Sequence, residues 1–194
     1  MKTKSQPPLE SRDPQDMHPL VAAYYELNQL KLLYRQGWLK RGISPVLCES
    51  VAEHTLGVAV LAMWIADLHF QHLDRQKVLR MALLHDFGEI YAGDITPADP
   101  VESTEKNRQE AQAVRKVFSR LVNGADYLGC WEEFERGETP EARFVRQIDR
   151  LEMALQASIY VEQGLESREE FFATARGAIS DAVLLEIFQT VEKS

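Results

Sequence analysis

Two histidines and two aspartates in this sequence have the side-chain types and the placement needed to bind a divalent cation. His85 and Asp86 are adjacent, His54 precedes them and Asp149 follows them. Two imidazoles and two carboxylates form a mixed nitrogen and oxygen ligand set that suits a divalent metal ion. Each of the three surrounding segments has a helical pattern, and helices that face one another can hold such ligands inside a bundle core.

Each of these four residues also has an ordinary structural explanation. A single core-facing histidine is more often a hydrogen-bonded structural residue than a metal ligand, and a single aspartate is usually a helix cap or a salt-bridge partner. The four together favour a metal. Burying two carboxylates is costly unless a cation or several hydrogen bonds compensate the charge, and one shared metal ion supplies that compensation.

Two further carboxylates follow the His85-Asp86 pair. Glu89 lies one helical turn beyond His85, and Asp94 follows Gly93, a residue that lets the backbone turn sharply. They suit either a catalytic base with its orienting partner or the ligands of a second cation. The alternatives are a solvated helix end for Glu89 and a turn residue or short cap for Asp94.

Apolar spacing predicts an all-α bundle that positions these residues, because no segment shows a convincing two-residue alternation. His54 follows Val51 by three residues and precedes Val58 by four, so its side chain should point toward the core. Ser50 and Glu53 have the form of a capping box at the start of that helix. Further helices are expected over 19–34, 74–87, 99–121 (with Asp99 as its cap), from Thr139 onward, and as one or two helices over 169–191.

Length and composition predict one compact domain over residues 17–194, preceded by a disordered tail over residues 1–16. The formal net charge of −8 argues against binding a nucleic acid polymer, but not against a small anionic substrate. Cys48 and Cys130 have no metal-type spacing and look like ordinary thiols. The tail lacks the apolar stretch of a signal peptide, and no apolar run is expected to approach the roughly 20 residues of a membrane span. We therefore expect a cytoplasmic protein.

The order of the histidines and aspartates resembles the signature of the HD-domain metal-dependent phosphohydrolases. A closer resemblance, over roughly residues 20–162, is to the HD-domain-containing 5′-deoxynucleotidase family. Six blocks carry it: Leu33–Gly42, Glu49–His54, Ala82–Asp86, Glu89–Pro97, Trp131–Glu135 and Thr139–Asp149. A lone His-Asp pair is a weak signal, whereas these blocks in this order are specific.

The resemblance implies an HD-domain helical bundle that hydrolyses nucleoside 5′-monophosphates, especially deoxynucleotides, to nucleoside and phosphate. It implies a homodimer and a cobalt, manganese, copper or magnesium cofactor. By motif position, His54, His85, Asp86 and Asp149 would bind the metal. Glu89 would be the catalytic carboxylate, and Asp94 would assist it and contact the substrate. The eukaryotic-type branch also implies a second cation site at Glu89, Asp94 and the carbonyl oxygen of Ile95.

The phosphate-binding loop departs from the bacterial pattern, in which an arginine directly precedes a tryptophan. Here Gln36 and Gly37 separate Arg35 from Trp38. Arg35 is the positional match for the phosphate ligand, and Arg41 is the alternative. Trp38 either contacts the substrate or simply packs the loop on the bundle. Glu132–Glu135 is a weaker candidate for contact with the sugar or base.

Two other functions remain open from the sequence. The first is another HD hydrolase, such as a cyclic-nucleotide phosphodiesterase or an alarmone hydrolase, although His18, His69 and His72 lie outside the motif blocks. The second is a non-catalytic nucleotide sensor, which should lose ligands that this chain keeps. For a dimer surface, the sequence offers only an apolar group near the C-terminus that equally suits the core: Leu184, Leu185, Ile187 and Phe188.

Overall fold

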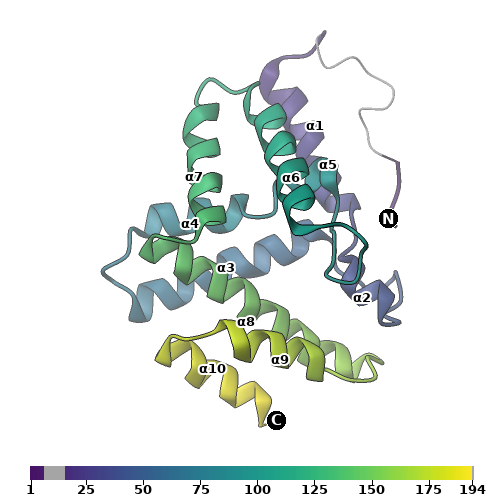
Figure 1. The fold of residues 1–194 in the computed structure, drawn as a ribbon, viewed down its shortest axis with the longest axis vertical. Coiled ribbons are helices and arrows are strands. Elements are labelled where there is room, and N and C mark those ends of the chain that lie inside the picture. The colour runs from purple at the N-terminus through teal and green to yellow at the C-terminus, as the bar shows by residue number, and fades with distance from the viewer. Residues whose placement is uncertain (7–15, 194) are drawn as a thin grey trace.

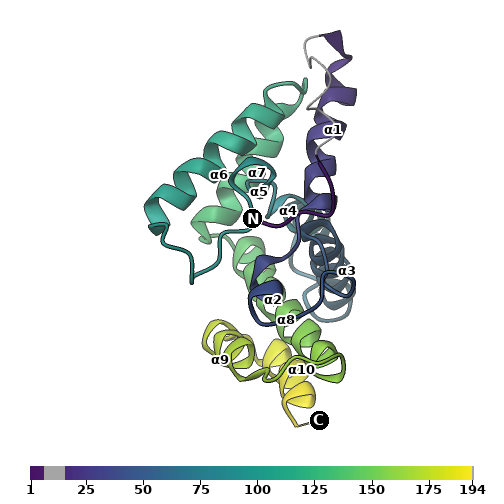
Figure 2. The same cartoon turned by 90° about the vertical axis from the view of Figure 1, so that its right-hand side faces the viewer.

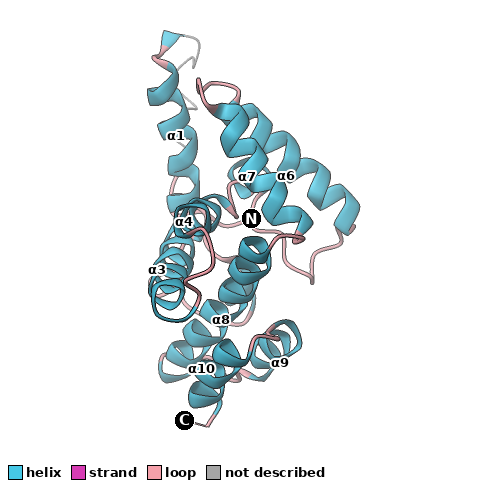
Figure 3. Ribbon diagram, turned by 90° about the vertical axis from the view of Figure 1, so that its left-hand side faces the viewer, coloured by secondary structure: helices cyan, strands magenta, loops and turns pink. Residues whose placement is uncertain are grey.

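The computed structural model of the chain describes residues 1–6 and 16–193. Within these residues every regular element is an α-helix, and Figure 3 shows no strand among them. The all-α prediction is confirmed. The helices are α1 (Pro19–Leu32), α2 (Gln36–Lys40), α3 (Val51–His69), α4 (Arg75–Leu84), α5 (Glu89–Ala92), α6 (Ser103–Phe118), α7 (Gly124–Arg136), α8 (Pro140–Glu162), α9 (Glu169–Ala178) and α10 (Ala182–Glu192).

Helices α3, α4 and α8 form the centre of the molecule. Helix α3 packs against both α4 and α8. Helices α1, α6 and α7 lie at one end, and α9 and α10 lie at the other, as Figures 1 and 2 show from two directions. The central helices therefore have neighbours on several sides, and polar side chains on their inner faces are removed from water.

The first central helix begins as its sequence predicts. The Ser50 hydroxyl accepts a hydrogen bond from the Glu53 backbone, and the Glu53 carboxylate accepts one from the Ser50 backbone, which completes the capping box. Val51 and Val58 are fully buried, and His54 between them is 1% exposed. The prediction that His54 faces the core is confirmed.

Helix α3 also corrects the prediction about apolar runs. By length and composition it is the one helix of the described residues that could cross a membrane, and 44% of the relevant window is buried inside the molecule. A core helix of a soluble protein passes the same test. In this structure α3 carries His54 on a face covered by α4 and α8.

The remaining helices match the predicted boundaries unevenly. Helix α8 follows Thr139 as predicted, whereas α6 begins at Ser103 and not after Asp99. The carboxylate of Asp99 instead accepts hydrogen bonds from Thr96 and Lys40, which closes a turn before the helix. The sequence patterns predict neither α2 nor α7, because both contain or adjoin glycines that also suit loops.

The two chain ends were predicted as helices at the C-terminus and as a disordered tail at the N-terminus. The C-terminal segment forms the pair α9 and α10, and Leu184 and Phe188 are buried in the core, so they are not a surface for another chain. At the other end, Lys4 donates a backbone hydrogen bond to Leu32, and Lys2 bonds the Gln36 side chain. Residues 7–15 of the predicted disordered tail lie outside the described residues.

Candidate metal centre

The imidazole of His54 is placed by α3 and fixed from behind by a carboxylate. Its Nδ1 lies 2.6 Å from Oε2 of Glu152 on α8. Its Nε2 points the other way and lies 3.2 Å from Oδ1 of Asp149 and 3.6 Å from Oδ2 of Asp86. A histidine whose Nδ1 is held by a carboxylate presents Nε2 for coordination.

His85 and Asp86 lie in the tight turn that follows α4. Hydrogen bonds from Phe87 to Leu84 and from Glu89 to Asp86 span three residues, so the helix narrows there before α5 begins. The Nδ1 of His85 lies 2.7 Å from the carbonyl oxygen of Ala82, and its Nε2 lies 3.3 Å from Oδ2 of Asp86. The turn therefore aims both side chains at the same point as His54.

Four side chains thus converge, as the sequence predicts. Ligand atoms of His54, His85 and Asp149 all lie within 4.8 Å of one another. The Nε2 atoms of both histidines and Oδ2 of Asp86 are buried and make no hydrogen bond of acceptable geometry. Ligands bonded to a metal at about 2.1 Å lie roughly 3 Å or more apart. The donor set and the convergent unpaired atoms therefore fit a divalent cation.

The electrostatics of the centre also favour a cation. Burial and the charge of Arg35 would each lower the pKa of His54, but the carboxylates of Glu152 and Asp149 outweigh them and hold that pKa well above its ordinary value. Burial would raise the pKa of Asp86, but the two histidines and Arg35 hold it far below its ordinary range. A site that attracts a proton onto a buried imidazole attracts a metal ion for the same reason.

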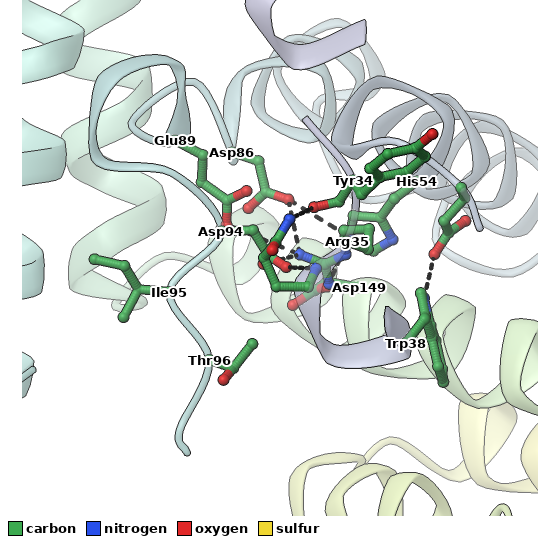
Figure 4. A network of polar contacts seen from close by, with 12 residues as sticks. Tyr34, Arg35, Trp38, His54, Asp86, Glu89, Asp94, Ile95, Thr96 and Asp149 are labelled. Atoms are coloured by element: carbon green, nitrogen blue, oxygen red, sulfur yellow. Dashed lines mark hydrogen bonds and ion pairs between the residues drawn. The ribbon is translucent and has the colours of Figure 1, made fainter. Parts of the chain in front are cut away.

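Arg35 connects this centre to the second group of carboxylates. Its Nη1 lies 3.0 Å from Oδ1 of Asp94, 3.7 Å from Oδ2 of Asp86 and 3.8 Å from Oε1 of Glu89. Figure 4 shows the guanidinium between these side chains. Arg35 precedes α2, and the backbone N–H of Gln36 donates a hydrogen bond to the second oxygen of Asp94. The loop arginine and the carboxylates after α4 therefore form one network.

Glu89 is the most unusual carboxylate of this group. It is 4% exposed, and its Oε2 is buried without a hydrogen-bond partner. Burial, followed by the charges of Asp86 and Asp94, raises its pKa well above the ordinary value. A buried carboxylate with a raised pKa is a candidate for holding or transferring a proton.

Two cavities adjoin the centre. The smaller, of about 430 Å³, is lined by Arg35, Trp38, Arg41, Ile95 and Phe171 among others. The larger, of about 820 Å³, lies toward α6, α7 and the first half of α8. Both are lined by the same five residues beside the predicted metal position: Asp86, Glu89, Lys106, Asp149 and Arg150. The centre therefore opens on two sides.

The two other candidates of the phosphate loop have partners within the protein. Trp38 is 3% exposed, its ring lies 4.2 Å from that of Phe171, and its indole N–H donates to Glu49. Arg41 forms an ion pair with Glu170 on α9. Both line the smaller cavity, but Arg41 is not part of the network around Asp86 and Asp94. Arg35 alone of the three reaches these carboxylates.

Sequence reasoning missed three polar residues at the centre. Glu152, Glu49 and Lys106 were not predicted. Glu152 follows Asp149 by three residues on the same helical face, which is a recognisable signal. Burial and the neighbouring Glu152 raise the pKa of Glu49 to about 7. Of Glu132–Glu135, Glu135 lines the larger cavity, and Glu132 pairs with Arg115 away from it.

Comparison with known proteins agrees with this geometry. Residues 27–191 match the sequence profile of the HD domain family HD_3. The chain belongs to the HD domain family. Among curated relatives, 5′-deoxynucleotidase HDDC2 of Bos taurus is 34% identical over 172 residues, covering 86% of this chain and 80% of the relative. The 5′-deoxynucleotidase YGK1 of Saccharomyces cerevisiae is 34% identical over 160 residues, covering 78% and 70%. The resemblance predicted from the sequence is confirmed.

Solved structures show the same HD-domain fold. The PH0347 protein of Pyrococcus horikoshii OT3 has a TM-score of 0.77 and 30% identity, with 89% of this chain and 98% of that chain covered. A protein of Magnetospirillum magnetotacticum MS-1, described as a predicted metal-dependent phosphohydrolase, has a TM-score of 0.71 and 25% identity, with 90% of each chain covered. The HD-domain bundle is therefore the architecture of this chain.

Proposed function

We propose that this HD-domain protein is a 5′-deoxynucleotidase, a metal-dependent hydrolase that removes phosphate from nucleoside 5′-monophosphates. The observation that carries the proposal is the convergence of four ligand side chains beside Arg35 and Glu89. The identity with curated 5′-deoxynucleotidases over most of the chain supports the choice of substrate. His54, His85, Asp86 and Asp149 would hold one divalent ion, for which we propose cobalt, manganese, copper or magnesium.

The chemistry follows from the charge of the substrate. A phosphomonoester is a dianion that repels an incoming nucleophile, and a bound divalent cation neutralises its oxygens and acidifies water. Arg35 can bind two phosphate oxygens through its planar guanidinium. Burial would lower the pKa of Arg35, but Asp94, Asp86 and Glu89 hold it well above its ordinary value, so the charge is permanent. Asp94 orients that guanidinium through the 3.0 Å contact.

Glu89 is proposed as the residue that transfers a proton. Its raised pKa suits either removal of a proton from the attacking water or protonation of the leaving 5′-oxygen. Glu89→Ala should lower kcat by roughly 10²- to 10⁴-fold while substrate still binds. If kcat on deoxynucleoside monophosphates stayed at the wild-type value, Glu89 would have no catalytic role. Loss of a metal ion from the variant would instead assign Glu89 to a second cation.

Arg35→Ala tests the phosphate contact. If the contact forms equally in the ground and transition states, KM should rise, and if it tightens during the reaction, kcat should fall. The matched control is Arg41→Ala, because Arg41 is held by Glu170 outside the carboxylate network. Equal effects of the two substitutions would contradict the assignment of the phosphate to Arg35.

A substrate panel separates this activity from the alternatives. Purified protein with added manganese or cobalt should release phosphate from deoxynucleoside 5′-monophosphates. Ring opening of cyclic nucleotides to monophosphates, or release of pyrophosphate from alarmones, without phosphate release from monophosphates would favour another HD hydrolase. Tight nucleotide binding with no turnover under any metal would favour a sensor. His18, His69 and His72 do not support a second histidine-rich metal site, since His18 only caps α1 and the other two are exposed beyond the centre.

We also propose that the protein is a homodimer that pairs through the outer face of α3. Leu56, Met63, Trp64 and Leu68 on that face are 61, 40, 58 and 70% exposed. Glu53 with its partner Lys4 lies at one end of the face, and Asp67 with its partner Arg75 lies at the other. Each end of the face therefore carries one cation and one anion, and antiparallel pairing about Val60 would bring Lys4 near the second copy's Asp67.

Light scattering at micromolar concentration tests the dimer. Twice the 22.2 kDa chain mass is expected. Trp64→Lys should give monomers, whereas the control Leu20→Lys on α1 should not. A wild-type mass of one chain at all concentrations would contradict the dimer. The cytoplasmic location and the absence of a nucleic acid polymer as partner stay predictions.

A further inference from the structure

Lys106 on α6 extends a permanent positive charge toward the catalytic carboxylates. Its Nζ lies 3.2 Å from the carbonyl oxygen of Ile95 and 3.6 Å from Oε1 of Glu110. The side chain is 33% exposed and lines both cavities. Burial would lower the pKa of Lys106, but Glu110, Glu89 and Asp86 raise it, so the ammonium stays charged.

Helix α6 packs closely against the turn between α4 and α5, which carries His85 and Asp86, and the backbones approach closely at Gly88. A Cβ atom added there would lie 2.5 Å from Cβ and 3.0 Å from Cα of Glu110. Only a glycine lets the two segments come this near without displacement. Lys106 lies one turn before Glu110 on the same helix, so the contact that requires Gly88 also fixes Lys106 beside Glu89.

The family resemblance implies a second cation site at Glu89, Asp94 and the Ile95 carbonyl oxygen, but most of these oxygens already face cationic or N–H groups. The Ile95 carbonyl accepts from Lys106, and the two oxygens of Asp94 accept from Arg35 and from the Gln36 backbone. Oε1 of Glu89 lies 3.8 Å from Arg35. A divalent ion at this position would have to displace the Lys106 ammonium and lie against the Arg35 guanidinium. Only Oε2 of Glu89 is left without a partner.

We propose that the side chains of Lys106 and Arg35 take the place of a second cation and supply its positive charge. We further propose that Lys106 binds the substrate phosphate from the α6 side. The protein then works with one divalent ion per chain, held by His54, His85, Asp86 and Asp149. This assignment rests on the proposed phosphatase function. Lysine serves as a compact point charge for phosphate, whereas arginine binds through its fork, so the two residues complement one another.

Manganese binding to the full chain tests the assignment independently of catalysis. Electron paramagnetic resonance of free Mn²⁺ should count one tightly bound ion per chain in the wild type. Lys106→Met, which keeps the aliphatic length and removes the charge, should admit a second ion. Lys106→Arg should keep the count at one. Lys116→Met is the matched control, because Lys116 lies on the same helix over the ring of Tyr91.

Kinetics on a deoxynucleoside monophosphate provide the second readout. Lys106→Met should raise KM by about 10- to 100-fold, the loss expected for a charged hydrogen bond to phosphate, and high Mg²⁺ should partly restore it. Two ions in the wild type, or an unchanged count and KM in Lys106→Met, would overturn the assignment. If the wild type hydrolysed no monophosphate, the proposed function would fail, and the Mn²⁺ count would still decide whether Lys106 excludes a second ion.

Discussion

Glu152 should control the metal affinity of the centre although it is not itself a predicted ligand. Its Oε2 lies 2.6 Å from Nδ1 of His54, and both side chains are buried. Carboxylates that hold a ligating histidine typically contribute 10- to 100-fold to metal affinity. We therefore expect Glu152→Ala to weaken Mn²⁺ binding by that factor, or about 1.4–2.8 kcal/mol. Glu152→Gln, which can still accept from Nδ1–H, should lose less than about tenfold.

The assay is isothermal titration of metal-free protein with Mn²⁺, accompanied by thermal unfolding to verify the fold. Glu162→Ala, at the exposed end of the same helix, is the control and should bind as the wild type does. Gly57→Ala offers an independent perturbation, because its Cβ would lie 2.6 Å from Oε1 of Glu152. A folded Glu152→Ala protein with wild-type Mn²⁺ affinity would refute the argument.

Three further predictions concern the surroundings of the centre. Gly88→Ala should lower stability by about 1–3 kcal/mol, measured by denaturant unfolding, because the new methyl group overlaps Glu110. Burial raises the pKa of Glu110 from 4.5 to about 7, so the folded state retains a proton that the unfolded chain releases. Glu110 should therefore contribute a fall of up to about 3 kcal/mol in the free energy of unfolding of metal-free protein as pH rises from 4.5 to 7, and Glu110→Gln should remove that contribution. Glu170→Ala, which frees Arg41 outside the carboxylate network, should leave both the KM for nucleotides and the Mn²⁺ affinity near their wild-type values; an altered Mn²⁺ affinity would contradict separate roles for the two regions.

The ligand helices were predictable because their local signals agree with their environment. The capping box at Ser50 fixes where α3 begins, and the neighbours Val51 and Val58 fix the inward direction of His54. Thr139 likewise fixes the start of α8, which carries Asp149. In these segments the spacing of the apolar residues predicts both the helix and the face that is buried, so the sequence alone predicts where the ligand side chains point.

The connections were harder to predict because their conformation depends on distant partners. Asp99 has the form of a helix cap, but Lys40 and Thr96 bind its carboxylate and lower its pKa to about 2. Lys106 comes near Glu89 only because α6 packs on Gly88. Because two residues separate Arg35 from Trp38, the sequence alone does not decide which arginine binds the phosphate. In the structure the ion pair with Asp94 places Arg35 beside the metal centre.

The central claim is that one divalent ion held by His54, His85, Asp86 and Asp149 supports hydrolysis of a nucleoside 5′-monophosphate. The most direct test titrates metal-free protein with Mn²⁺ and follows bound metal and phosphate release from a deoxynucleoside 5′-monophosphate in the same samples. We predict that the rate rises in proportion to occupancy up to one ion per chain, and that Asp149→Ala loses both together. Phosphate release that is independent of occupancy, or full occupancy and activity in Asp149→Ala, would contradict the claim.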